Sequence, residues 1–140
     1  MNHQNKFEYL RDASLSSSHR ADRFIQQLGY TPQVKDCEKE MNKLYKKFPE
    51  LYENFISLSE QRLSGDHKDS TIYEAKNANP IFCRSISSMH QAPIWSEWMK
   101  WILENLKALD SLNFTNVLDC GCDTGVTTFF LAALYPEANI

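Results

Sequence analysis

A strand, a tight turn and a helix are predicted in one continuous run, residues 116–135, which restricts the fold more than any other part of the chain. Residues 117–120 are mostly apolar and suit a short buried strand, whereas Gly121 and Gly125 bracket a turn. Residues 127–135 are apolar on most sides and predict a helix. The run therefore predicts a strand–turn–helix unit.

The predicted turn has features that suit ligand binding. Glycines let the backbone approach a ligand without an intervening Cβ, and amides at the start of a helix bind polar ligand groups. Asp119 stands at the carboxyl end of the predicted strand, where open parallel sheets place their ligand sites. Together these features predict a nucleotide-like ligand.

The run Val-Leu-Asp-Cys-Gly-Cys-Asp-Thr-Gly at 117–125 resembles the first motif of class I S-adenosylmethionine-dependent methyltransferases, roughly hydrophobic-hydrophobic-Asp/Glu-x-Gly-x-Gly-x-Gly. Two of the three motif glycines match, and Asp123 stands at the middle position. Asp tolerates a left-handed backbone better than most residues do, so the loop can still form. Further matching residues follow at Thr127, Leu131, Ala132, Pro136 and Ala138.

The resemblance implies that the cofactor is S-adenosylmethionine. Gly121 and Gly125 would shape the loop around the amino-acid end of the cofactor, and Asp119 would orient its ammonium group directly or through water. Three further residues of the loop complete the implied cofactor-binding set: Cys122, Asp123 and Thr124. The methyl acceptor stays open, because the same cofactor fold serves small-molecule, carrier-bound, RNA and protein substrates, and the catalytic residues stay unassigned.

The turn has two other interpretations. A dinucleotide-binding Rossmann fingerprint requires Gly-x-Gly-x-x-Gly, whereas this chain has Gly-x-x-x-Gly and does not fit. The second interpretation is a turn that joins a strand to a core helix and binds nothing, which a short motif cannot eliminate.

A whole methyltransferase sheet would need several more strands, each joined by a crossover of about a dozen residues or more. The resemblance also implies an acidic residue after the second strand that holds the ribose hydroxyls, and the chain ends at Ile140 before reaching it. We therefore expect the amino-terminal part of a methyltransferase, truncated after the first motif and inactive alone.

Composition sets limits on the partners. Hydrophobic residues make up 42% and charged residues 24% of the 140 residues, as in an ordinary globular domain. The net charge of −3 predicts no general attraction to nucleic acid or to anionic membranes. The first residues lack the apolar core of a secretion signal, and no apolar run is long enough to cross a bilayer. We expect a cytoplasmic protein.

Four cysteines occur, and we expect their thiols to be reduced because a chain of this size does not need disulfides: Cys37, Cys83, Cys120 and Cys122. No metal site is predicted, because the Cys-x-Cys pair has neither a second cysteine pair nor a nearby histidine.

Helical periodicity dominates residues 18–63. A helix is expected over 18–28, capped by Ser18 and stopped by a left-handed Gly29. Thr31 and Pro32 are expected to start a second helix, whose apolar stripe continues to Phe48. Because Pro49 interrupts that pattern, residues 51–63 form either a new helix or the far side of a kink.

The next segments are less regular. Residues 64–80 are polar and predict an exposed loop, with a short helix near Tyr73 as an option, whereas 81–89 fit either a helix or extended chain. Residues 94–109 predict one long amphipathic helix, whose apolar stripe comprises Trp95, Trp98, Ile102, Leu106 and Leu109. Tyr73, Glu74 and His90 are weak candidates for a lid over the cofactor.

The predicted fold class is thus a mainly α-helical amino-terminal region followed by the first βα unit of a Rossmann-like α/β methyltransferase domain. The predicted domains are a flexible amino terminus (1–17), a helical region (18–110) and an incomplete cofactor-binding domain (111–140). The functional hypothesis is a fragment of a methyltransferase. The alternative is a helical module that binds a protein partner or forms a homodimer and has no catalytic activity.

Overall fold

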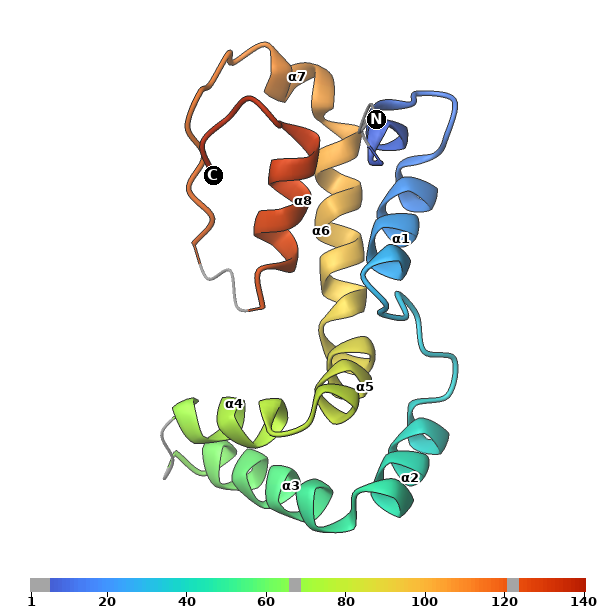
Figure 1. Cartoon of the computed structure of the whole chain (residues 1–140), viewed down its shortest axis with the longest axis vertical. Coiled ribbons are helices and arrows are strands. Elements are labelled where there is room, and N and C mark those ends of the chain that lie inside the picture. Colours follow the sequence, from blue (N-terminus) through green and yellow to red (C-terminus); the bar gives the residue numbers. More distant parts are fainter. Residues whose placement is uncertain (1–5, 66–68, 121–123) are drawn as a thin grey trace, which may run out of the picture. The chain divides into compact units, whose positions relative to one another are not determined.

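The computed structural model describes residues 6–65, 69–120 and 124–140, which form eight α-helices and one 3-10 helix (Figure 1). The chain divides into two compact units: one comprises Met1–Pro32 and Pro93–Ile140, and the other comprises Gln33–Ala92. Residues 93–110, which the sequence groups with the helical region, thus belong to the same unit as residues 111–140. No helix among the described residues combines the length and the apolarity that crossing a bilayer requires.

The first unit, unit 1, has helices from both ends of the chain. They are η1 (Glu8–Arg11), α1 (Ser17–Gln27), α6 (Ala92–Glu104), α7 (Leu106–Asp110) and α8 (Val126–Leu134). Aromatic rings join three of these helices, because Phe130 of α8 lies 5.3 Å from Phe24 of α1 and 5.9 Å from Trp98 of α6 between ring centroids. Phe24 and Phe130 are fully buried, so this cluster forms the core of unit 1.

The start of unit 1 follows the sequence pattern with a shifted cap. Ser16, rather than Ser18, caps α1, since its hydroxyl accepts a hydrogen bond of 3.2 Å from the amide of His19. Gly29 has φ +83°, the left-handed conformation expected after this helix. The short turn expected before α1 is η1, and its Leu10 is fully buried.

The second unit, unit 2, is a cluster of four helices in sequence order (Figure 1): α2 (Cys37–Lys47), α3 (Pro49–Leu63), α4 (Asp69–Asn77) and α5 (Pro80–His90). Phe82 lies in its core. The ring centroid of Phe82 is 5.7 Å from that of Phe55 and 6.2 Å from that of Phe48. Pro49 is the first residue of α3, so residues 51–63 belong to a new helix.

One helix boundary in unit 2 differs from the sequence expectation, and two segments that the sequence left open are helical. The second helix begins after Asp36, whose carboxylate accepts a 2.9 Å hydrogen bond from the Lys39 amide, and not at Thr31 and Pro32. Most of the expected loop is α4, which contains the short helix near Tyr73 that the sequence offered as an option, and Ile72 and Ala75 are buried on one face of it. Residues 81–89 are helical, since the side chain of Asn79 caps the start of α5.

The long helix predicted over 94–109 is divided at Asn105. Asn105 has φ −103° and ψ 11°, outside the helical range. Its side-chain amide donates a 2.8 Å hydrogen bond to the carbonyl of Trp101, the competition with the backbone that makes Asn a poor interior residue in helices. The predicted stripe nevertheless faces the core, with Trp95 and Ile102 buried.

The prediction of a Rossmann-like βα unit is wrong, because all the regular elements among the described residues are helices and none is a strand. In place of a strand, Asn116 forms an isolated parallel bridge with Asn139. The Val117 amide donates to the Asn139 carbonyl at 2.8 Å, and the Asn139 amide donates to the Thr115 carbonyl at 2.9 Å. Leu118, assigned to a buried strand, is 85% exposed. An apolar run becomes a strand only where a continuous ladder of hydrogen bonds pairs it with a neighbouring strand. Here the run has a single bridge and no ladder among the described residues. The helical part of the prediction is consistent with the structure.

Candidate functional site

The turn before α8 has the backbone conformation that only glycine adopts easily. Gly125 has φ +77° and ψ 9°, in the left-handed region, and it immediately precedes the first residue of α8. A Cβ at this position would meet no atom within 4 Å. Glycine is therefore required here by backbone conformation and not by lack of space.

Asp119 is fixed to the start of α8 by two side-chain hydrogen bonds. The hydroxyls of Thr127 and Thr128 both donate to its Oδ2 atom, each at 2.7 Å. Asp119 is half-buried. No hydrogen bond to its Oδ1 atom comes from any residue that the structure describes. The helix thus holds one carboxylate oxygen, Oδ2, and no described residue donates to the other.

The first turn of α8 is a second polar feature of the same place. Its N-cap, Gly125, has no side chain to cap the helix, and the first turn carries no acidic residue. The backbone amides of a first helical turn have no partners within the helix and lie at the positive end of the helix dipole. A ligand with an ammonium group and a carboxylate therefore finds a complementary pair here: Asp119 for the cation and the helix amides for the anion.

Of the predicted cofactor-binding residues, three lie within the described part of the chain. Asp119 and Gly125 are half-buried at the start of α8, and Thr124 is exposed beside them in sequence. Gly121, Cys122 and Asp123 lie outside the described residues. The sequence did not identify Thr127 and Thr128 as the hydrogen-bond donors to Asp119.

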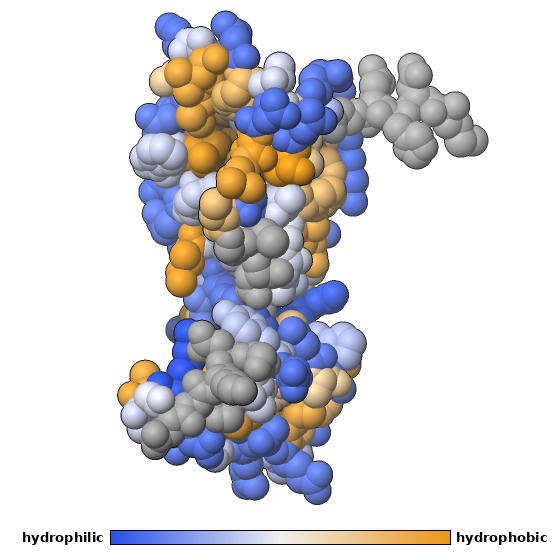
Figure 2. Space-filling view, turned by 90° about the vertical axis from the view of Figure 1, so that its left-hand side faces the viewer, coloured by the Kyte–Doolittle hydropathy of each residue, from blue (hydrophilic) through white to orange (hydrophobic). Residues whose placement is uncertain are grey.

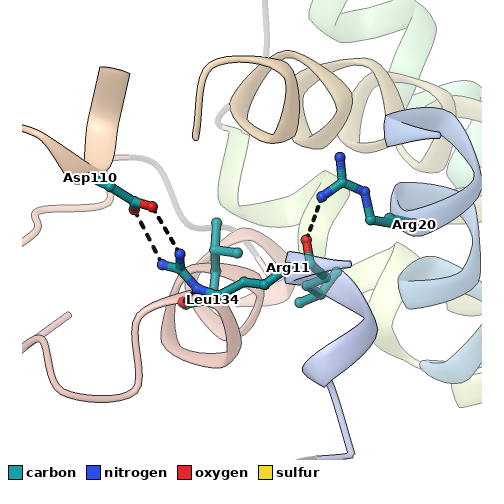
Figure 3. A network of polar contacts seen from close by, with 5 residues as sticks. Arg11, Arg20, Asp110 and Leu134 are labelled. Atoms are coloured by element: carbon teal, nitrogen blue, oxygen red, sulfur yellow. Dashed lines mark hydrogen bonds and ion pairs between the residues drawn. The ribbon is translucent and has the colours of Figure 1, made fainter. Parts of the chain in front are cut away.

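A second polar cluster holds the carboxyl end of α8. Arg11 donates two hydrogen bonds to the Asp110 carboxylate, at 2.9 and 3.3 Å, and a third from Nε to the Leu134 carbonyl at 3.1 Å (Figure 3). Its guanidinium also lies 5.0 Å from the centre of the Tyr135 ring. The hydrogen bonds from Arg11 lower the pKa of Asp110 and the contact with Asp110 raises the pKa of Arg11. Sequence gives no signal for this pair, which is 99 residues apart.

Buried Arg20 lies near this cluster in the same view (Figure 3). It donates a 2.7 Å hydrogen bond to the Leu10 carbonyl, which fastens α1 to η1. Burial lowers the pKa of this guanidinium. Arg11 thus joins η1 to α7 and to the carboxyl end of α8, whereas Arg20 joins α1 to η1.

The cysteines and the other possible metal ligands form no metal site among the described residues. The thiols of Cys37, Cys83 and Cys120 are free, and Cys122 lies outside the described residues. Within the described ranges, no group of three or more His, Cys, Asp or Glu side chains is placed to hold a metal ion.

The weak candidates from the sequence belong to unit 2. Tyr73 and His90 line the same cavity, whereas Glu74 is exposed on α4 and is not among the residues that line it. Tyr73 and His90 therefore lie at one cavity of unit 2.

Comparisons with known proteins assign neither a family nor a function to this chain. No protein family, curated protein or solved structure matches this chain. The site has to be interpreted from its own geometry.

Proposed function

We propose that this chain supplies part of the cofactor site of an S-adenosylmethionine-dependent methyltransferase, which transfers a methyl group to a small-molecule or carrier-bound acceptor. One arrangement supports the proposal: Thr127 and Thr128 hold the Oδ2 atom of Asp119, and no described residue donates to its Oδ1 atom. A left-handed glycine and a helix start without a side-chain cap lie beside it. The free thiols of the described cysteines suit a reducing compartment, and the cytoplasm is the proposed location.

The proposed role of Asp119 is to bind the ammonium group at the amino-acid end of the cofactor. Hydrogen bonds from two threonines fix the carboxylate before the ligand arrives, so less conformational freedom is lost on binding. The amides of the first turn of α8 bind the cofactor's carboxylate, and Gly125 keeps the backbone clear of it. The cofactor supplies an electrophilic methyl group on a sulfonium sulfur. The described residues orient it, which is the principal requirement for such a transfer.

Titration with two related ligands tests the proposal. S-adenosylhomocysteine carries the amino-acid end, whereas adenosine lacks it. In a nuclear magnetic resonance titration, we expect S-adenosylhomocysteine to shift the amide signals of Gly125, Thr127 and Thr128. Adenosine should leave them in place at the same concentration. Equal shifts with both ligands, or no shift with either in a folded sample, would contradict the proposed role of Asp119.

A second candidate function is a helical interaction module that forms a homodimer. Ile94 and Trp101 of α6 are seven residues apart and share one helical face, and they are 68% and 56% exposed. Apolar surface also gathers on the part of unit 1 that faces the viewer in Figure 2. Leu112 and Leu118 are further exposed apolar residues of unit 1. Exposed apolar residues that gather in one region indicate an interaction surface.

Light scattering after size exclusion separates the two candidates. A dimer that fails to bind S-adenosylhomocysteine and that dissociates in the Trp101→Glu variant supports the interaction module. A monomer that binds the ligand supports the methyltransferase. Lys107→Glu, an exposed change on α7, is the matched control because it adds the same side chain outside the Ile94–Trp101 face.

A further inference from the structure

Unit 1 contains a cavity between η1, α1, α6 and α7. Its volume is about 410 Å³, within the range of small-molecule sites. Its charged lining residues are Arg11, Arg20, Glu104, Lys107 and Asp110. All of the described lining residues belong to unit 1, and none of them belongs to the Asp119 site.

Arg20 is a buried cation of this lining whose hydrogen-bonding capacity is only partly used. It is 7% exposed. Its Nη1 atom donates to the Leu10 carbonyl at 2.7 Å (Figure 3), whereas its enclosed Nε atom has no acceptor. No described residue accepts a hydrogen bond from its Nη2 atom either. Because buried charged groups are as a rule paired and fully hydrogen-bonded, the unused donors of Arg20 indicate a ligand with an acceptor.

The described residues leave the charge of Arg20 without an ion pair. Burial lowers the pKa of Arg20, and the charge of Asp12 opposes that shift. The Oδ1 atom of Asp12, however, accepts hydrogen bonds from the amide and the hydroxyl of Ser14, at 2.9 and 2.7 Å. Since water screens a buried guanidinium little, it attracts an anionic group more strongly than a surface arginine does.

Glu104 carries the opposite charge in the same lining, and no described residue forms an ion pair with it. Its Oε1 atom accepts a 3.0 Å hydrogen bond from the Ser17 hydroxyl, and none of the described residues donates to its Oε2 atom. Arg11 and Asp110 pair with each other at 2.9 Å and compensate each other's charge. A buried cation and an exposed carboxylate therefore remain for a ligand, with exposed Lys107 as a further cation.

The rest of the lining is aliphatic. Leu103 is buried and Leu106 is half-buried, and Ala13 lies in the same lining. An aliphatic group that leaves water to pack on these side chains is stabilised in proportion to the apolar area that it buries. This lining favours a ligand with a short hydrocarbon part.

We propose that this cavity binds a small aliphatic α-amino acid. Its carboxylate accepts a hydrogen bond from Nη2 of Arg20, and its ammonium group donates to Oε2 of Glu104. Its side chain packs on Leu103 and Leu106. A ligand with a single charge would leave either Arg20 or Glu104 without a countercharge, whereas an amino acid supplies both. The inference goes beyond the proposed cofactor site and does not depend on it.

Leucine, isocaproate and isoamylamine are suitable probes because they share one branched hydrocarbon chain. Isocaproate lacks the ammonium group of leucine, and isoamylamine lacks its carboxylate. We expect leucine to bind the 140-residue chain at least about tenfold more tightly than either, since hydrogen bonds to charged groups are the stronger ones. In a nuclear magnetic resonance titration, amide shifts at Ala13, Glu104 and Lys107 locate the site. Equal affinity for leucine and either analogue, or no binding of leucine to the folded chain, would overturn the proposal.

Variants connect the affinity to the two charges. Glu104→Gln keeps the acceptor for the Ser17 hydroxyl and removes the charge. It should weaken leucine binding by about tenfold and leave isocaproate binding unchanged. Arg20→Met should weaken the binding of both ligands, and thermal unfolding verifies that it is folded. Because Glu104 is exposed, its variant tests the proposal even where Arg20→Met fails to fold.

Glu97→Gln is the matched control. Glu97 is an exposed carboxylate on the same helix, α6, where it lies 3.6 Å from Lys100 and does not line the cavity. This variant should bind leucine as the wild type does. Leucine affinity that is unchanged in Glu104→Gln, or lowered equally in Glu97→Gln, would refute the proposal.

Discussion

The hydroxyl of Thr127 donates a 2.7 Å hydrogen bond to the carboxylate of Asp119, eight residues earlier in the chain. Thr128 donates to the same oxygen at the same distance. These contacts connect the segment before the turn to the first helical turn after it. They give the turn a fixed polar group, on which the proposed cofactor site depends.

The conformation of Gly125 should make this position sensitive to substitution. Gly125→Ala should destabilise the chain by about 1 kcal/mol, because a left-handed backbone is unfavourable for a residue with a Cβ. Gly125→Asn should cost less, since Asn tolerates that conformation, and Gly125→Val should cost more. Chemical denaturation measures all three. The order Asn, Ala, Val is the expected result, and equal costs would argue against a left-handed turn.

Tyr9 should make unit 1 sensitive to alkaline pH. Burial raises the pKa of Tyr9 to about 12 from 10.0, and its hydroxyl donates a 2.9 Å hydrogen bond to Gln27. The folded state therefore holds this proton more tightly than the unfolded state does. The corresponding stability is complete below pH 10.0 and is lost as the pH rises toward the folded pKa, about 2 kcal/mol in all.

The matched variant for this test is Tyr9→Phe, which keeps the ring and removes the titrating group. Its free energy of unfolding should fall less steeply with pH than that of the wild type over the same alkaline range, where Tyr135, whose pKa burial also raises, still titrates. A wild-type chain whose stability falls no more steeply than that of the variant would show that Tyr9 titrates normally.

Asp110 should contribute to stability with the opposite pH dependence. Its pKa is lowered from 3.8 chiefly by the hydrogen bonds from Arg11. The contribution is therefore complete above that ordinary value and is lost as the pH falls through the lower folded pKa. Both side chains are more than 40% exposed, so we expect less than about 1 kcal/mol.

Asp110→Asn should remove this acid dependence and little else. Denaturation of the variant and the wild type at neutral and acidic pH measures the difference. Glu53→Gln, an exposed carboxylate in unit 2, is the control and should leave the acid dependence of unit 1 intact. A wild-type chain and an Asp110→Asn variant with the same acid profile would contradict the assignment.

Sequence patterns predicted those helices whose apolar faces are long and whose ends carry strong signals. Gly29 ends its helix in the left-handed conformation, and Pro49 begins a new one, because each residue restricts the backbone by itself. The apolar stripe around Trp95 and Ile102 is buried as its spacing indicates. Such signals are local, so one sequence suffices to read them.

Features that depend on distant contacts were missed or, like the short helix near Tyr73, left as an option. The helix α4 has few apolar residues, and its position depends on burying Ile72 and Ala75 against its neighbours. The apolar run around Leu118 has strand composition, but composition does not create the paired ladder that a strand requires. The contact of Arg11 with Asp110 joins segments 99 residues apart. For the candidate site, the sequence indicated Asp119 and Gly125 but not which side chains hold the carboxylate.

The Asp119→Asn substitution tests the central claim most directly, because Asn can still accept both threonine hydrogen bonds but carries no charge. The measurement is the affinity for S-adenosylhomocysteine, followed through the amide signals of Gly125 and Thr127, with Glu53→Gln as the control. The account predicts that the control binds as the wild type does and that Asp119→Asn binds roughly tenfold more weakly or worse, at unchanged stability. Equal affinity of the wild type and Asp119→Asn would contradict it.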